Sequence, residues 1–229
     1  MKIWAFIPAG GVGTRMGAAM PKQYLHLGGQ PLVQRSINKL NAHKRIHAVV
    51  AGISKHDTYW ESHSISGVSA VTWAGDERAN TVLAGLNRLI ELAHKDDWVM
   101  VHDAARPLVE EADIDRLVQH GMKTDDGGLL AISVTDTIKQ TDNARIITRT
   151  LERSNIWRAA TPQIFPLRLL NRCLQQAIDD KVVITDEASA MEHGGYKPLV
   201  IPCDSNNIKI TTPDDLEYAH WVLKRKESL

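Results

Sequence analysis

Three glycines and two cations near the N-terminus form the pattern with the clearest chemical meaning in this chain. Gly10, Gly11 and Gly13 follow a short apolar run, and Arg15 and Lys22 come soon after them. Glycine leaves backbone N–H groups uncovered, so a glycine-rich loop after a strand can line a chain of phosphates closely. The two cations add fixed positive charge beside that loop. The pattern therefore predicts a site for a nucleoside triphosphate.

Two better-known glycine loops do not fit these residues. A dinucleotide-binding loop needs the pattern G-x-G-x-x-G, but Met16 stands where the third glycine would be. A P-loop needs Gly-Lys-Ser/Thr after four spacer residues, and the loop does not have that sequence. The remaining alternative is a strand-to-helix turn without a ligand, and such a turn would not need two cations at this spacing.

Asp103 is the candidate for binding a metal ion. It follows the apolar run 98–101, so its carboxylate should emerge at the carboxyl end of a strand. Mg²⁺ takes a carboxylate together with phosphate oxygens and keeps several waters, so Asp103 and a triphosphate could hold it. The carboxylate could instead cap the following turn or pair with Arg106. His102 should point to the opposite face of the strand, and we interpret it as structural.

The elements that must position these residues alternate along the chain between apolar strand-like runs and helical patterns. Strands are predicted at 2–8, 47–53, 70–73, 98–102, 127–134 and 197–201, and helices near 31–43, 78–93 and 110–123. This alternation is typical of an α/β fold, with a mostly parallel sheet covered by helices on both faces. Ligands of such folds bind at the carboxyl ends of the strands, where the glycine loop and Asp103 would both lie.

One segment interrupts this alternation. Residues 137–140 and 145–151 are strand-like and flank a turn-rich connection at 141–144. A two-stranded arm is marginally stable alone, so it should lie against something else. Its own domain is one candidate surface.

The last helix has a clear start. Thr212 is a natural N-cap, Pro213 suits the first turn, and Asp215 completes a capping box. The helix should fix the end of a strand at 207–210, and thereby the position of Lys209. A lone cation in a buried strand is costly without an anionic partner, which favours a functional role for this lysine.

Composition limits the class of protein. The chain has 229 residues, with 27 Lys plus Arg and 27 Asp plus Glu, and its net charge is zero. We therefore expect one domain over 1–229, without the basic excess typical of partners of nucleic acid or anionic membranes. The apolar runs are too short to span a bilayer, and we see no leader-like segment. Two cysteines in unrelated contexts indicate neither a disulfide framework nor a zinc site. These features predict a soluble, cytoplasmic protein.

Five later motifs make a resemblance specific. They are Gly75-Asp76-Glu77-Arg78, Val101-His102-Asp103-Ala104-Ala105-Arg106-Pro107, Thr161-Pro162-Gln163, Ile184-Thr185-Asp186-Glu187-Ala188-Ser189 and Asn207-Ile208-Lys209-Ile210-Thr211. With the glycine loop and Pro21-Lys22-Gln23, they resemble the family of 2-C-methyl-D-erythritol 4-phosphate cytidylyltransferases, over about residues 3–222.

This resemblance implies an activity, a cofactor and an assembly. The family belongs to the non-mevalonate isoprenoid pathway and transfers CMP from CTP to 2-C-methyl-D-erythritol 4-phosphate. The products are 4-diphosphocytidyl-2-C-methyl-D-erythritol and pyrophosphate. The resemblance further implies a Rossmann-like nucleotidyltransferase fold, a Mg²⁺ ion and a homodimer. In that dimer the arm at about 137–155 reaches across to the second subunit and completes a shared active site.

The resemblance also implies roles for individual residues. CTP would be bound by Ala9, Gly10, Gly11, Arg15, Lys22, Gly75, Asp76, Thr81, Asp103 and Ala104. The polyol phosphate would be bound by Asp103, Thr137, Arg153, Thr161, Thr185 and Lys209, and the metal by Asp103. The catalytic residues would be Arg15, Lys22, Arg153 and Lys209. If the resemblance is set aside, the sequence pattern predicts only that Asp76 is the N-cap of the helix that starts at Arg78.

The reaction needs cations more than it needs a general base. The attacking phosphate monoester is already ionised near neutrality, because its second pKa is about 6. The difficulty is to bring two anions together and to stabilise the charge that develops at phosphorus. We therefore expect the lysines and arginines of the motifs to carry the chemistry.

Four positions depart from the pattern of the family. Gly10 stands where many relatives have alanine, Thr14 where many have arginine, Ala74 where a second glycine is common, and Thr81 where serine is common.

Two other functions remain open at this stage. A ribitol 5-phosphate cytidylyltransferase would share the fold, the loop and the metal, but the motifs at 184–189 and 207–209 favour methylerythritol phosphate. A non-catalytic nucleotide-sensing module would not need to keep a second phosphate site.

Overall fold

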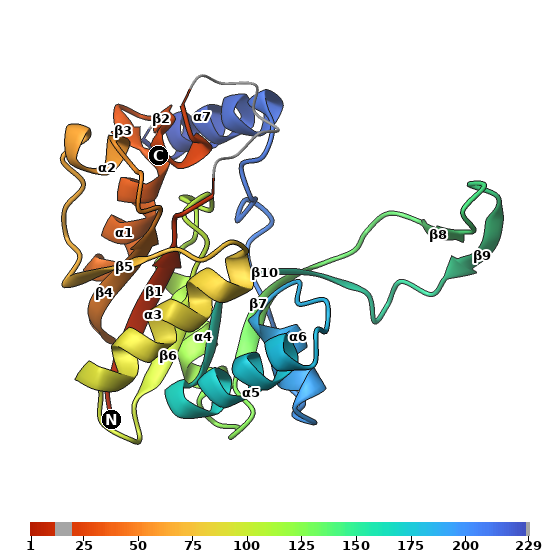
Figure 1. Ribbon diagram of the computed structural model, residues 1–229. Helices are drawn as coiled ribbons and strands as arrows, with labels where there is room; N and C mark the ends of the chain where they lie inside the picture. Colours follow the sequence, from red (N-terminus) through yellow and green to blue (C-terminus); the bar gives the residue numbers. More distant parts are fainter. Residues whose placement is uncertain (12–19, 228–229) are drawn as a thin grey trace.

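A seven-stranded sheet forms the centre of the protein (Figure 1). The computed structural model describes residues 1–11 and 20–227, so Arg15 and Thr14 lie outside the described residues. The order of the strands is β11-β7-β10-β6-β1-β4-β5. Their bounds are β1 Ile3–Pro8, β4 Ile46–Ile53, β5 Ala70–Trp73, β6 Trp98–Val101, β7 Gly128–Ser133, β10 Trp157–Pro166 and β11 Leu199–Pro202.

The sheet is mostly parallel, as the sequence predicts. Every neighbouring pair of strands is parallel except the two pairs that involve β10, which runs antiparallel between β6 and β7. β6 and β7 therefore point the same way. Asp103 follows β6 and the glycine loop follows β1, so both lie at the carboxyl edge of the sheet.

Helices cover both faces of the sheet. They are α1 Leu32–Ala42, α2 Tyr59–Ser62, α3 Arg78–Leu92, α4 Glu111–Gly121, α5 Leu167–Asp179, α6 Glu187–His193 and α7 Pro213–Glu227. The short elements η2 Lys22–Tyr24, β2 His26–Leu27 and β3 Gln30–Pro31 lie between β1 and α1 in the chain. Side chains of β1 alternate between the two cores: Ile3, Ala5 and Ile7 pack with α1 and α4, whereas Trp4 and Phe6 pack with α3 and α5.

The predicted elements have observed counterparts with one exception. The segment 207–210 is not a strand but an irregular stretch outside the sheet, in which the Ile210 N–H donates to the Ala105 carbonyl over 2.9 Å. The sequence also gave no signal for β10. Thr161, Pro162 and Gln163 interrupt its apolar pattern, and the register of its pairing with β7 shifts between Ala159 and Gln163.

The arm extends away from the rest of the protein. Its strands, β8 Ile138–Thr141 and β9 Ile147–Leu151, form a sheet of their own and, among the described strands, pair with each other alone. Figure 1 shows this sheet projecting to one side of the molecule. The alternative of an arm folded back on its own domain is therefore wrong. Because β10 is antiparallel, the arm leaves from the end of β7 and returns at the same edge of the sheet.

The predicted capping box at the last helix is confirmed. The Thr212 N–H donates to the Asp215 carboxylate over 2.8 Å, and the Asp215 N–H donates to the Thr212 hydroxyl oxygen over 3.3 Å. Of the helices in the described part of the chain, none has the length and apolar character to cross a membrane.

Asp97 fixes the edge of the sheet opposite the site. Its carboxylate is 2% exposed and accepts hydrogen bonds from the Lys2 N–H at 2.7 Å, the Trp4 indole N–H at 3.1 Å and the His94 N–H at 3.0 Å. Burial alone would raise the pKa of Asp97, but these donors outweigh it and the pKa is lowered. The ionised carboxylate therefore stabilises the native state above the unfolded-state pKa, at about pH 4, and less as the pH falls.

We expect Asp97→Asn to lower the free energy of unfolding at pH 7 by about 1–3 kcal/mol, because one acceptor is replaced by a donor. The difference in the free energy of unfolding between the variant and the wild type should decrease below about pH 4, where the wild type itself loses this interaction. Urea unfolding at the two pH values measures both effects. A gap that stayed constant with pH would show that the charge of Asp97 contributes nothing.

Candidate active site

A cleft of about 680 Å³ opens at the carboxyl ends of β1 and β6. The glycine loop and the start of η2 line one side, and the residues that lead into α3 line the other. Most of the residues predicted to bind the nucleotide meet here: Ala9, Gly10, Gly11, Lys22, Gly75, Asp76, Thr81, Asp103 and Ala104, with Lys209 beside them.

The two loops that form the walls touch each other at one end of the cleft. A Cβ atom added to Gly10 would lie 2.2 Å from the Cβ of Ala74, so there is room for only one methyl group between them. Behind this contact, the Ala9 N–H donates to the Gly52 carbonyl at 2.7 Å, and the Gln23 amide donates to the Ala9 carbonyl at 2.8 Å. The glycine loop is thereby held to β4 and to η2.

The opposite wall is the entry to α3. Glu77, not Asp76, is the N-cap of this helix, and its side chain makes no capping hydrogen bond, so the interpretation of Asp76 as N-cap is wrong. The Thr81 hydroxyl is buried and donates to the Glu77 carbonyl at 3.1 Å. A Cβ added to Gly75 would lie 2.4 Å from that of Asn80, which requires glycine there.

Lys22 enters the cleft from η2. Its Nζ donates to the Ile210 carbonyl over 3.2 Å, which links η2 to the segment that carries Lys209. The end of η2 is anchored by its last residue, Tyr24, which is buried and whose hydroxyl donates to the Asp57 carboxylate over 2.6 Å. Lys22 is therefore presented from a fixed turn.

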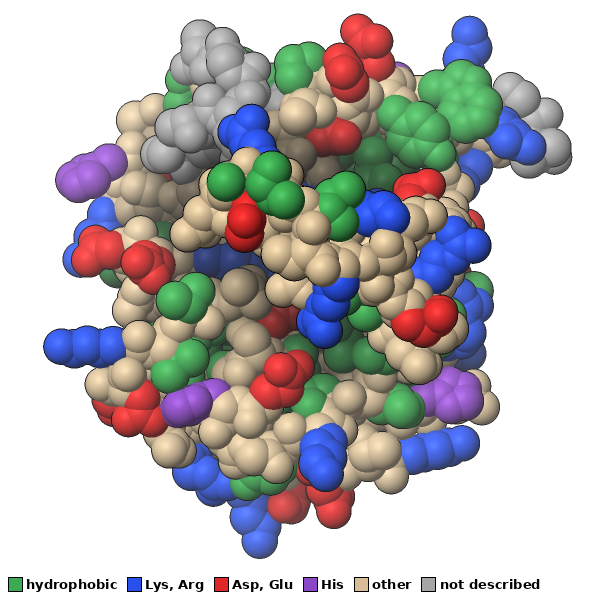
Figure 2. Space-filling model, turned by 90° about the vertical axis from the view of Figure 1, so that its right-hand side faces the viewer, with side chains coloured by type: hydrophobic (Ala, Val, Ile, Leu, Met, Phe, Trp, Pro, Cys, Tyr) green, Lys and Arg blue, Asp and Glu red, His purple; other side chains and the backbone are tan. Residues whose placement is uncertain are grey.

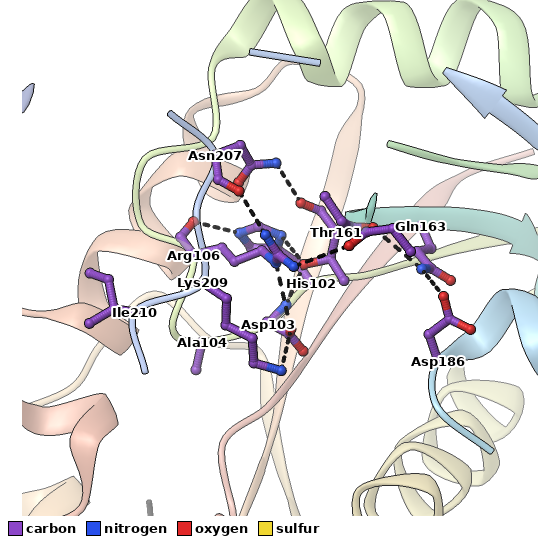
Figure 3. A network of polar contacts seen from close by, with 12 residues as sticks. His102, Asp103, Ala104, Arg106, Thr161, Gln163, Asp186, Asn207, Lys209 and Ile210 are labelled. Carbon is purple, nitrogen blue, oxygen red and sulfur yellow. Dashed lines mark hydrogen bonds and ion pairs between the residues drawn. The ribbon is translucent and has the colours of Figure 1, made fainter. Parts of the chain in front are cut away.

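Asp103 lies where cations converge (Figure 3). Its carboxylate is 3.1 Å from Arg78 Nη2 through Oδ1, and 2.9 Å from Lys209 Nζ and 3.7 Å from Arg106 Nε through Oδ2. Burial alone would raise the pKa of Asp103, which is 7% exposed, but Arg78 and Lys209 outweigh burial and hold the pKa far below its usual range. The ion pair with Arg106 that the sequence left open is present.

His102 has a structural role, as its predicted orientation indicates. It is fully buried, with Nε2 3.1 Å from the Arg106 carbonyl and Nδ1 3.0 Å from the Thr161 hydroxyl oxygen. Because the carbonyl can only accept, Nε2 carries the proton and Nδ1 accepts from the hydroxyl. The Thr161 oxygen in turn accepts the Asp103 N–H at 3.0 Å. Burial lowers the pKa of His102 to about 4, so the ring is neutral at pH 7.

A second cavity of about 450 Å³ adjoins the first. Thr161 and Thr185 line it, as the sequence predicts for the acceptor side, together with Asp103 and Lys209, which line both cavities. The Thr161 proton is already donated to His102, so this hydroxyl cannot also donate to a phosphate in this arrangement.

Two predicted acceptor residues lie elsewhere. Thr137 and Arg153 are exposed residues at the base of the arm and line neither cavity. Arg153 donates to the Thr135 carbonyl instead. Within one chain, the structure does not bring these two residues to Asp103.

Arg78 and Glu187 also belong to the site, although the sequence motifs indicate no role for either residue. Arg78 lines both cavities and binds the carboxylates of both Asp103 and Glu187. One signal was present in the sequence: Arg78 is the first residue of a predicted helix, where the helix dipole disfavours a cation. A cation at that position indicates anionic partners nearby.

The Gly10–Ala74 contact predicts a compensating pair of substitutions. Gly10→Ala should lower the free energy of unfolding by about 1–3 kcal/mol, because the added methyl overpacks the junction of the two loops. In an Ala74→Gly background, where the opposing methyl group is absent, Gly10→Ala should lower the free energy of unfolding much less. Chemical denaturation of the four proteins measures this coupling.

Gly11→Ala is the matched control, since a Cβ added there meets no atom of the described residues within 4 Å. Equal losses for Gly10→Ala with and without Ala74→Gly would contradict the contact.

Comparison with known proteins identifies the family of the chain. Residues 3–225 match the family model described as IspD: 2-C-methyl-D-erythritol 4-phosphate cytidylyltransferase. Enzymes of that name from Photorhabdus laumondii and Tolumonas auensis are 43% and 41% identical to the chain, over 98% and 97% of it and 96% and 97% of their own lengths.

A solved structure gives the same result for the fold. The crystal structure of the 2-C-methyl-D-erythritol 4-phosphate cytidylyltransferase of Francisella tularensis is similar with a TM-score of 0.82 and 35% identity. The match covers 96% of this chain and 99% of that one. Family model, sequence relatives and architecture thus agree over almost the whole length. The chain belongs to the 2-C-methyl-D-erythritol 4-phosphate cytidylyltransferase family.

Proposed function

We propose that this protein transfers the cytidylyl group of CTP to 2-C-methyl-D-erythritol 4-phosphate. The relatives are named for this reaction, and the observation that carries the proposal is the pair of adjoining cavities that share Asp103, Arg78 and Lys209. One cavity holds the triphosphate beside the glycine loop, and the other holds the acceptor phosphate. The reacting groups then meet where the two cavities join.

The chemistry follows from the charges at that junction. An oxygen of the acceptor phosphate attacks the α-phosphorus of CTP, and the bond to the β-phosphate breaks with its electron pair leaving on pyrophosphate. Negative charge accumulates at the α-phosphorus, and cations aimed at it lower the barrier. We assign this role to Lys22 from the nucleotide side and to Lys209 from the junction. Arg15 is assigned to the triphosphate from the resemblance.

Lys209 must exchange partners for this role. It now pairs with Asp103 Oδ2, but its side chain is 39% exposed and can turn toward a bound phosphate. The same exchange frees an oxygen of Asp103. The residues present therefore fit a Mg²⁺ ion, since one ionised carboxylate together with phosphate oxygens and waters satisfies this metal. When bound, the ion would neutralise phosphate charge.

Recognition of the base is assigned to the end of the cleft. Ala9, Gly10, Gly75 and Asp76 place backbone groups there, and cytosine can be told from uracil by such donors and acceptors because a mispaired polar group is costly. The Thr81 hydroxyl is bound to the Glu77 carbonyl, so we assign Thr81 to shaping this wall. Gly11 and Ala104 leave room for the sugar and the phosphates.

We propose that a second copy of the chain completes the site through its arm. Ile146 and Ile147 on the arm are 64% and 59% exposed, and apolar side chains on a projecting ribbon favour a covering surface. Acidic and basic side chains are interspersed on the face that carries the arm (Figure 2), so two copies can approach there without one sign of charge opposing the other. Thr137 and Arg153 of one chain would then reach the acceptor cavity of the other.

The two alternative functions fit less well. A ribitol 5-phosphate cytidylyltransferase would differ on the acceptor side, and the family match favours methylerythritol phosphate. A nucleotide sensor would not need the second cavity or Lys209 at the junction of the two.

Release of pyrophosphate from CTP, with methylerythritol phosphate and ribitol 5-phosphate supplied separately, tests the function. We expect turnover with the first alone, and its loss in EDTA. In this assay Lys22→Ala and Lys209→Ala should each lower kcat by about 10²–10³, because each removes a contact to developing charge. Lys95→Ala, an exposed lysine far from the cavities, is the control. Turnover with ribitol phosphate, or lysine variants near the wild type, would contradict these assignments.

Mixing two inactive variants tests the shared site. Lys209→Ala and Arg153→Ala homodimers should both be inactive, because every site carries one lesion. In a mixed dimer one site collects both lesions and the other collects none, so random exchange of subunits should restore roughly a quarter of the sites. Mass spectrometry confirms the exchange. If activity does not return after exchange, Arg153 acts within its own chain.

A further inference from the structure

Arg78 lines both cavities, as Asp103 and Lys209 do, but no role for it follows from the motifs. It is the first residue of α3 and lines both the nucleotide cavity and the acceptor cavity. Its partner Glu187 is the first residue of α6, and it lines neither cavity. The hydrogen bonds between these residues connect α3, which follows the loop 74–77 at the nucleotide cavity (the nucleotide loop), to α6, which follows the loop 180–186 at the acceptor cavity (the acceptor loop).

The Arg78 guanidinium donates hydrogen bonds to two carboxylates, along two of its edges. Toward α6, Nη1 donates to Glu187 Oε1 at 2.7 Å and Nη2 donates to Oε2 at 3.1 Å, which is a bidentate pair. Toward β6, Nε and Nη2 donate to Asp103 Oδ1 at 3.2 Å and 3.1 Å. Lysine could not reproduce these four donations, because it offers three donors from a single nitrogen.

Glu187 is fixed on its own side. It is 2% exposed, so its charge depends on Arg78 for compensation. Asp186, one residue earlier, caps α6 and accepts the Gln163 amide at 2.9 Å, while the Gln163 oxygen accepts the Ala188 N–H at 2.9 Å. The start of α6 is therefore held to β10 at the acceptor cavity, and Glu187 holds Arg78 to the same end of α6.

The two carboxylate oxygens of Asp103 therefore differ in how firmly their partners are held. Oδ1 is held by Arg78, which Glu187 anchors in turn, whereas Oδ2 is held by the half-exposed Lys209 and, at 3.7 Å, by Arg106. Arg78 keeps the carboxylate in one orientation while Lys209 exchanges partners. Without that anchor, the carboxylate could turn and follow Lys209.

We infer that the Arg78–Glu187 pair is a positioning element that orients Asp103 and fixes the acceptor loop against the nucleotide loop. This inference rests on the proposed function. Glu187 lines neither cavity, so its contribution acts through Arg78 and through the start of α6. The pair should therefore affect the chemical step and acceptor binding more than CTP binding.

The test uses the full-length protein with Glu187→Gln, Arg78→Lys and the double variant. Glu187→Gln should lower kcat roughly 10- to 100-fold, since small errors in position cost that much, and should raise the KM for methylerythritol phosphate. The Kd for CTP, from calorimetry, should stay within about twofold of the wild type. The double variant should be no slower than Arg78→Lys alone, because both changes break one unit.

Arg88→Lys and Glu91→Gln on the same helix are the matched control. This pair is also an Arg–Glu ion pair, but it is exposed, and its loss should change neither kcat nor the KM for the acceptor. If Glu187→Gln does not fold, Glu187→Asp keeps the charge and shortens the reach, and it should show a smaller decrease of kcat.

Different results would refute the proposed function and the positioning role of the Arg78–Glu187 pair. A wild-type protein that releases no pyrophosphate from CTP and methylerythritol phosphate would refute the proposed function. An active wild type whose Glu187→Gln variant unfolds at lower temperature, but keeps its kcat and its KM for the acceptor, would show that the pair is merely structural. Additive effects in the double variant would show that the two residues do not act as a unit.

Discussion

The ion pairs of one buried carboxylate hold this site together. Without Asp103, the cations Arg78, Arg106 and Lys209 would face one another in a half-buried space, and their repulsion would open it. With it, they stay close together before any substrate arrives. A site for two anions can therefore be assembled in advance, so that little reorganisation remains for the reaction itself.

The fold places this carboxylate through groups remote in sequence. The Asp103 N–H is bound by Thr161 of β10, which His102 orients, and Arg106 donates to the Asn207 carbonyl at 2.7 Å. The segment that carries Lys209 is thereby attached to the loop after β6 that carries Asp103. Residues without any chemical role in the transfer thus determine where the charged groups meet.

The sequence predicted most of what depends on local pattern, although it did not predict helix α5, and it missed what depends on distant partners. Apolar runs indicated most strands of the sheet, whereas the polar residues around Thr161 concealed β10. The alternating Ile208 and Ile210 resembled a strand, although the segment 207–210 pairs with no strand of the described residues. Arg78 has a role only because of Glu187, more than one hundred residues later. Gly10 and Ala74 each depart from the family pattern, and the structure shows that they share one contact.

The direction of β10 has a consequence for how such a protein can change. Because β7 and β10 are antiparallel neighbours, the chain between them begins and ends at the same edge of the sheet, beside the cavities. Residues inserted there need not cross a face of the sheet or displace a helix. The arm can thus lengthen, shorten or acquire new contacts while the catalytic core keeps its topology. The arm and the core that carries the cavities can therefore change in sequence at different rates.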